Sequence, residues 1–216
     1  MNKRCIISLA NERGNYQKAL DRLEASVKQY NPEIDFFGYR SEDEVGAPKH
    51  LDNPYAFKVY AFYKAFYDGY TQVLWLDSSV VLRADITPVF DEIENNGYIM
   101  QEAGCFVGQW CNDFTLDYFR LTRDEANKML MYGNAGLLGL NKNNHAAEAF
   151  YDAWWAALLA GCFKGDWETH RHDMTVGSII ANRNGMQYKK GDEWLQYSSP
   201  DAPLINETIL LSAQGM

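Results

Sequence analysis

The chain has 216 residues, with 29 acidic and 20 basic side chains, a net charge of −9 and 47% hydrophobic residues. A chain of this size and composition can bury roughly 70% of its unfolded surface around one core, which excludes a disordered or fibrous protein. We therefore expect residues 1–216 to form a single domain. Charged residues interrupt every apolar run before the roughly 20 residues that a membrane-spanning helix needs, so no membrane span is expected.

Charge and cysteine content narrow the functional classes further. The acidic balance disfavours a broad surface for nucleic acid or anionic membrane, because both partners require clustered Lys and Arg. The four cysteines show no CxxC spacing, which argues against a zinc ribbon or a disulfide framework. We expect reduced thiols in the core of a cytoplasmic protein.

Strand and helix patterns alternate along the chain. Apolar runs predict buried strands at residues 4–10, 34–39, 73–76, 97–101 and 136–140. Helical periodicity and capping signals predict helices at 16–30, 54–70, 87–95, 122–132, 144–159 and 173–182. Thr87 is expected to cap the third helix and Thr122 the fourth, and the polar segment 41–53 is expected to be a loop.

This alternation predicts an α/β fold, a single-domain three-layer sandwich with a mostly parallel central sheet. Ligands of such sheets bind at the carboxyl ends of the strands. The residues that follow the predicted strands are therefore candidates for binding: Ala10 and Asn11, Arg40, Asp77 to Ser79, and the region of Asn134 and Gly136.

Asp77 is the most informative of these residues, because it directly follows the apolar run Val73-Leu74-Trp75-Leu76. A carboxylate at the edge of a dry core costs free energy unless a cation or a hydrogen-bond donor compensates it. One interpretation is a turn in which Asp77 caps neighbouring amides with Ser78 and Ser79. The other is a ligand for Mg²⁺ or Mn²⁺, which take few protein carboxylates and complete their shells with water and phosphate oxygens.

The stretch from Lys58 to Leu82, which ends in Trp-Leu-Asp-Ser-Ser-Val-Val-Leu, resembles the helix, strand and DxD segment of GT-A-fold nucleotide-sugar glycosyltransferases, particularly glycogenin-like ones. In that family a lysine early in the helix touches the donor, and Lys58 matches it. The DxD carboxylates bind a metal on the nucleotide diphosphate; Asp77 matches the first, whereas Ser79 stands at the second. The resemblance thus implies a UDP-sugar donor and Mn²⁺ or Mg²⁺ held by Asp77 and Ser79.

Two later segments are similar to parts of the same family. Gly133 to Asn141 resembles its Asn-(small)-Gly strand, which implies that Asn134 and Gly136 line the sugar and acceptor pocket; tight strand packing is the alternative. His172-Asp173-Met174 resembles a segment whose Asp contacts the donor sugar or acts as base, so Asp173 is the expected base and Glu168 the second candidate. We also consider His172 as an additional metal or diphosphate ligand, and Trp167 as a substrate contact.

The resemblance runs in family order from residue 4 to about 180 and implies transfer of a sugar from a nucleoside diphosphate to an acceptor hydroxyl. Ala10, Asn11, Arg40, Lys58 and Ser78 are expected on the donor. Two alternatives stay open. One is a noncatalytic module that binds nucleotide sugars or glycans, and the other is a phage-type enzyme that glycosylates a modified DNA base through Arg171, Arg183, Lys189 and Lys190. The acceptor is expected to be a glycan, a protein or a modified nucleic acid.

Overall fold

The computed structural model describes residues 3–12, 14–190, 193–198, 201–205 and 210–213; the side chains of 133–135 and 213 fall outside this description. A central five-stranded sheet has the order β2-β1-β3-β6-β5. Its strands are β1 (Arg4–Leu9), β2 (Asp35–Tyr39), β3 (Gln72–Leu76), β5 (Tyr98–Phe106) and β6 (Leu130–Asn141). Because β6 runs antiparallel to both β3 and β5, the other four strands share one direction, which confirms the mostly parallel sheet.

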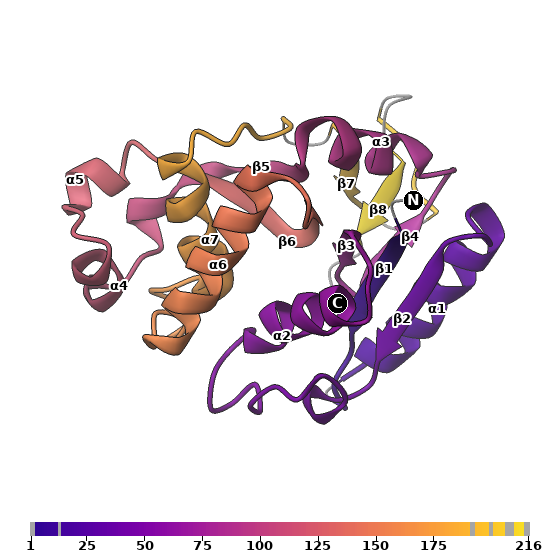
Figure 1. The fold of residues 1–216 in the computed structure, drawn as a ribbon, viewed down its shortest axis with the longest axis horizontal. Coiled ribbons are helices and arrows are strands. Elements are labelled where there is room, and N and C mark those ends of the chain that lie inside the picture. Colours follow the sequence, from indigo (N-terminus) through magenta and orange to yellow (C-terminus); the bar gives the residue numbers. More distant parts are fainter. Residues whose placement is uncertain (1–2, 13, 191–192, 199–200, 206–209, 214–216) are drawn as a thin grey trace.

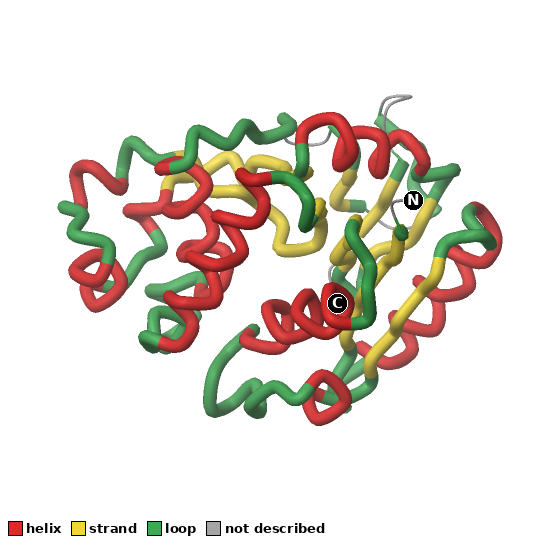
Figure 2. Tube along the Cα trace, in the orientation of Figure 1, coloured by secondary structure: helices red, strands yellow, loops and turns green. Residues whose placement is uncertain are grey.

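Helices cover both faces of this sheet (Figures 1 and 2). On one face, α1 (Tyr16–Tyr30) and α3 (Thr87–Asn96) pack over Ile6, Leu74 and Leu76. On the other, α2 (Ala56–Tyr67), α6 (His145–Leu159) and α7 (His172–Arg183) pack over Ile7, Val73 and Trp75. Alternate residues of a strand point to opposite faces, so the unbroken apolar run of β3 is explained by burial on both.

Smaller elements complete the chain. A second sheet has the order β4-β8-β7 and joins β4 (Val80–Leu82) to β7 (Leu195–Tyr197) and β8 (Leu211–Ala213). The connection from β2 to α2 contains a short 3₁₀ helix, η1 (Glu42–Val45), before the long loop seen in Figure 2. The others are η2 (Val107–Gln109), α4 (Asp113–Tyr118) and α5 (Arg123–Ala126).

Two local predictions are wrong. The helix expected from Thr122 to about residue 132 is only α5; the capping box between Thr122 and Glu125 forms, but residues from Leu130 onward join β6 and pair with β5. Sheet pairing therefore overrides the helical signal. At α3 the N-cap position is Ile86 rather than Thr87, because the Ile86 carbonyl accepts the first N–H groups of the helix, from Val89 at 2.9 Å and Phe90 at 3.4 Å.

The described part of the chain can be compared with the expectations of reduced cysteines and of no membrane-spanning helix. All four cysteines are free thiols, and three of them are buried. No described helix is long and apolar enough to cross a membrane.

Candidate active site

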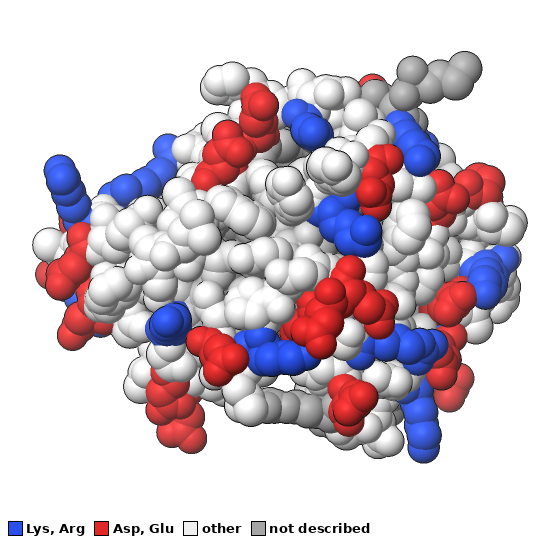
Figure 3. Space-filling view, turned by 60° about the horizontal axis from the view of Figure 1, so that its bottom comes forward, with Lys and Arg blue, Asp and Glu red and all other residues white. Residues whose placement is uncertain are grey.

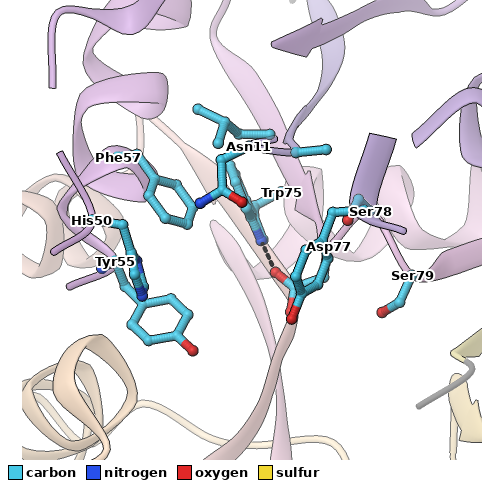
Figure 4. Close-up of a pocket in the computed structure, with 11 residues that line it drawn as sticks. Asn11, His50, Tyr55, Phe57, Trp75, Asp77, Ser78 and Ser79 are labelled. Carbon is cyan, nitrogen blue, oxygen red and sulfur yellow. Dashed lines mark hydrogen bonds between the residues drawn. The ribbon is translucent and has the colours of Figure 1, made fainter. Parts of the chain in front are cut away.

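A cavity of about 180 Å³ lies at the carboxyl ends of the neighbouring parallel strands β1 and β3. Figure 4 shows the side chains that surround it. Five of the predicted donor residues line it, namely Ala10, Asn11, Asp77, Ser78 and Ser79. The remaining lining residues are Leu9, Tyr16, His50, Tyr55, Phe57 and Trp75.

The Asp77 side chain is presented to this cavity by a turn that does not use its carboxylate. The Asp77 N–H donates to Gly136 O of β6 at 3.2 Å, and the Asp77 carbonyl accepts from the Val80 N–H at 2.9 Å. The carboxylate oxygen Oδ1 instead accepts from Trp75 Nε1 at 2.7 Å (Figure 4). With 37% of its side chain exposed, Asp77 is oriented by an indole two residues earlier on the same face and remains open to a ligand.

Lys58 of α2 forms ion pairs with two carboxylates, that of Asp77 and that of Asp173. Its Nζ is 3.4 Å from Asp77 Oδ1 and 3.1 Å from Asp173 Oδ2, and only 2% of its side chain is exposed. Burial alone would lower the pKa of Lys58, but Asp173 and then Asp77 raise it above the usual 10.5. Lys58 therefore stays protonated inside the protein and does not itself line the cavity.

Asp173 occupies the first turn of α7 and is as deeply buried as Lys58. Burial raises its pKa above 3.8, and the Lys58 ammonium opposes that rise. Asp173 Oδ1 has no hydrogen-bond donor among the described residues. Asp173, the expected base, is thus buried against Lys58. This position suits fixing Lys58 in place better than contacting an acceptor hydroxyl.

Tyr55, which lines the cavity, belongs to a cluster of aromatic rings that extends away from it. The Tyr55 ring centroid is 5.6 Å from that of Trp167 and 5.5 Å from that of His172. Tyr55 and His172 both have positive φ, 58° and 41°, a strained backbone that clusters at functional sites. His172 Nδ1 is 2.7 Å from Phe163 O and must carry the proton, because a carbonyl can only accept. Burial lowers the pKa of His172, so the neutral ring offers Nε2 as an acceptor.

Three other predicted site residues, Arg40, Glu168 and Gly136, do not line this cavity. Arg40 Nη2 pairs with Asp21 at 2.5 Å on the surface and lines an adjoining cavity. Glu168 is exposed, and its N–H donates to Asp166 Oδ1 at 3.1 Å. A Cβ on Gly136 would meet Leu195 and Val80 at ordinary distances, so its packing faces the second sheet, while its carbonyl holds Asp77. The Asn134 side chain lies outside the described residues.

The arrangement limits what could hold a metal ion. Within the described ranges, no three His, Cys, Asp or Glu side chains gather as a metal-binding group. Asp77 and Ser79 share the cavity, whereas His172 reaches it only through its contact with Tyr55. Of the described lining residues, Asp77 is the only Asp, Glu, Lys or Arg.

Sequence reasoning missed the residues that close the cavity opposite Asp77. His50 and Tyr55 come from the loop before α2, and His50 Nδ1 accepts the Tyr55 N–H at 3.3 Å. Phe57 follows them, and Tyr16 begins α1. Loops carry no periodic signal, so only the aromatic content of this segment could have drawn attention to it.

Solved structures share this architecture. One is a glycosyltransferase involved in glycosylation of the major capsid of PBCV-1, 15% identical, with a TM-score of 0.55 over 97% of this chain and 92% of that one. Another is the apo form of the glycosyltransferase GlyE of Streptococcus pneumoniae, 13% identical, with a TM-score of 0.57 over 98% of this chain and 54% of that one. The bifunctional glycosyltransferase WbbM matches at 12% identity and a TM-score of 0.53 over 98% of this chain and 45% of that one.

The chain has the GT-A type of glycosyltransferase fold. It spans about half the length of the GlyE and WbbM chains. No protein-family model matches the sequence, and no curated protein does. At identities of 12–15% the likeness is one of fold alone.

Proposed function

We propose that this chain transfers a sugar from a nucleoside diphosphate sugar to an acceptor hydroxyl, and that the donor is a UDP-sugar. The observation that supports it is Asp77: its carboxylate follows a buried strand, lines a cavity and is oriented by Trp75 and Lys58 rather than by neighbouring amides. Ligands of open α/β sheets bind at this edge.

Charge complementarity supports a cation in this site. A diphosphate beside Asp77 would meet a carboxylate and no described lining Lys or Arg, so binding requires a positive charge between them. Asp77 and Ser79 offer oxygen ligands of the kind that Mg²⁺ and Mn²⁺ take, with phosphate oxygens and water completing the shell. When bound, such an ion would stabilise the negative charge that grows on the departing diphosphate.

The chain's own residues would then position the reactants. Lys58, neutralised by Asp173, fixes the Asp77 carboxylate without competing for phosphate. Trp167 is 44% exposed, and we place the sugar against its exposed edge, because its ring faces already contact Arg171 and His172. We place the acceptor hydroxyl there, with Glu168 as the group that accepts its hydrogen bond, because Glu168 is exposed whereas only 3% of His172 is.

The test is replacement of Asp77 by Asn, followed by UDP release from UDP-sugars in Mn²⁺ with and without a glycan acceptor mixture. We expect a loss of at least about 100-fold with unchanged circular dichroism. Asp117→Asn, at an exposed position, is the matched control and should keep wild-type turnover. Normal turnover of the Asp77 variant would contradict the proposal. Wild-type protein that is stabilised by a UDP-sugar but releases no UDP would instead be a noncatalytic module.

A nucleic-acid acceptor is disfavoured by the state of the basic residues that it would need. Lys189 Nζ pairs with Glu92 at 2.8 Å, and the Arg171 guanidinium lies 4.0 Å from the Trp110 ring centroid and 4.1 Å from that of Trp167. On the face drawn in Figure 3, described Lys and Arg side chains are interspersed with Asp and Glu. Activity that falls steeply with salt would favour this alternative.

A further inference from the structure

A separate cavity lies between α2 and α6, two helices that cover the same face of the sheet (Figure 1). Its volume is about 210 Å³, several times the roughly 30 Å³ that one water takes in the liquid, so a small organic group fits inside. Phe57, in the first turn of α2, lines the Asp77 cavity, whereas this one is lined by the last two turns of that helix. Its aromatic lining consists of Tyr63, Phe66, Tyr67 and Tyr151.

The aromatic rings of this cavity are fixed by their neighbours. Phe66 and Tyr151 meet edge to face, with 5.3 Å between their ring centroids. The Tyr151 hydroxyl donates to Val59 O at 3.2 Å, which sets the orientation of that ring and occupies its polar group. Trp155 is half-buried, and its ring centroid is 5.5 Å from that of Tyr63 and 6.3 Å from that of Tyr151. The cavity therefore offers ring surfaces that are in place before a ligand arrives.

Two exposed carboxylates of α6, Glu148 and Asp152, also line the cavity. Neither forms an ion pair with a Lys, Arg or His in the part of the chain that the structure describes. Glu148 lies in the first turn, where the helix dipole favours a carboxylate, but Asp152 lies a turn further on. Burial and then the Asp152 charge raise the pKa of Tyr151 above its usual value of 10, so the field of this carboxylate reaches the ring.

One cation of the protein already lies against this cavity. Lys142 Nζ lies over the Phe66 ring, 5.8 Å from its centroid, and Lys142 is the only described Lys, Arg or His of the lining. A cation within about 6 Å of a ring centroid is attracted by the negative face of the ring. Because Glu148 and Asp152 outnumber this single ammonium, the charge balance of the lining favours a further cation.

We propose that this cavity binds a small quaternary ammonium ion of the choline type. The rings supply π faces for the methyl groups, and Glu148 and Asp152 supply the opposite charge. A quaternary ammonium donates no hydrogen bonds, so it loses less than a primary ammonium when ring faces replace water. A phosphate on the same ligand would be repelled by both carboxylates, which favours choline over phosphocholine. The proposal is independent of sugar transfer at Asp77.

The experiment measures by calorimetry how the full chain binds choline and 3,3-dimethylbutan-1-ol, in which a carbon replaces the charged nitrogen. Because the two compounds share a shape and differ in charge, wild type should bind choline about tenfold more tightly or better. Asp152→Asn should weaken choline binding about threefold or more, and Lys142→Gln should strengthen it about twofold or more. Neither variant should change the affinity for the alcohol. Phosphocholine should bind wild type more weakly than choline does.

A second variant tests the rings. Tyr63 is 51% exposed, so Tyr63→Leu should keep the fold and an apolar lining while it removes a π face. Choline binding should weaken about fivefold or more. Asp117→Asn and Tyr118→Leu change exposed residues of α4 and are the matched controls, which should leave choline binding unchanged. Asp77→Asn should also keep choline binding, which separates this proposal from the proposed function.

Several outcomes would overturn the proposal. Equal wild-type affinity for choline and the alcohol would do so, as would an absence of choline binding at about 20 mM. Choline binding that survives both Asp152→Asn and Tyr63→Leu unchanged would place the ion elsewhere. If glucose or maltose binds instead of choline and Tyr63→Leu abolishes that binding, the occupant is a sugar ring. Should Tyr63→Leu lose its fold by circular dichroism, the exposed Asp152→Asn and Lys142→Gln decide the matter through their opposite effects.

Discussion

Replacing Lys58 by Met tests the buried contact on which the position of Asp77 depends. The substitution removes the ammonium but keeps an unbranched side chain of similar length. Asp173, which is 3.1 Å from Lys58 Nζ and 2% exposed, is then left in the interior without its cation. Breaking a buried ion pair by removing one partner typically costs about 3–5 kcal/mol of unfolding free energy.

The pH dependence gives this cost a signature. Without Lys58, burial of Asp173 is unopposed, so its folded-state pKa rises further above 3.8 and the carboxyl is protonated in the folded protein. Holding that proton costs up to about 1.36 kcal/mol for each pH unit between the ordinary pKa and the raised one, so the cost grows as the pH rises. The group thus stabilises the fold below pH 3.8, and the contribution is lost as pH rises.

The assay is urea unfolding of wild type and Lys58→Met at pH 5 and pH 7. The difference in unfolding free energy between them should grow from pH 5 to pH 7, by at most about 2.7 kcal/mol, because Asp173 takes up its proton more readily without Lys58. Adding Asp173→Asn to Lys58→Met should remove most of that growth. Lys64→Met, on the exposed side of the same helix, should cost under about 1 kcal/mol at both pH values. A deficit for Lys58→Met that is equal at pH 5 and pH 7 would refute the reasoning.

Two further predictions concern packing and acid sensitivity. Gly139→Ala should destabilise the protein by about 1–3 kcal/mol, because its Cβ would lie 2.4 Å from Ile93 Cδ1; thermal unfolding checks this against Gly136→Ala, where the nearest atom is 3.4 Å away and the cost should be smaller. Burial lowers the pKa of His170 to about 4, so its contribution to stability is complete above pH 6.5 and is lost as pH falls toward 4. His170→Gln should flatten the urea-unfolding free energy across that window, and a slope equal to that of wild type would contradict the assignment.

Much of the fold follows from local patterns. The periodic apolar residues of α1, α6 and α7 predict these helices to within a residue or two, because burying one face of a helix imposes the spacing. The boundaries of β6 and α5 were not predictable in the same way. A capping box forms wherever its two side chains meet, but whether the next residues continue as helix depends on β5, a strand earlier in the chain that pairs with them.

Sequence patterns alone predict a carboxylate at the end of a strand that is buried on both faces. An apolar run such as residues 73–76 is stable only inside a sheet, and the charged Asp77 after it must lie at the sheet edge. The partners of that carboxylate follow from the fold. Lys58 and Asp173 are more than a hundred residues apart in sequence and meet because α2 and α7 cover the same face. Likewise, Glu42 reaches Asn11 because β1 and β2 are parallel neighbours. The spacing of apolar side chains shows which face of a helix or strand is buried. Contacts between residues at the edge of a sheet depend instead on the order of its strands.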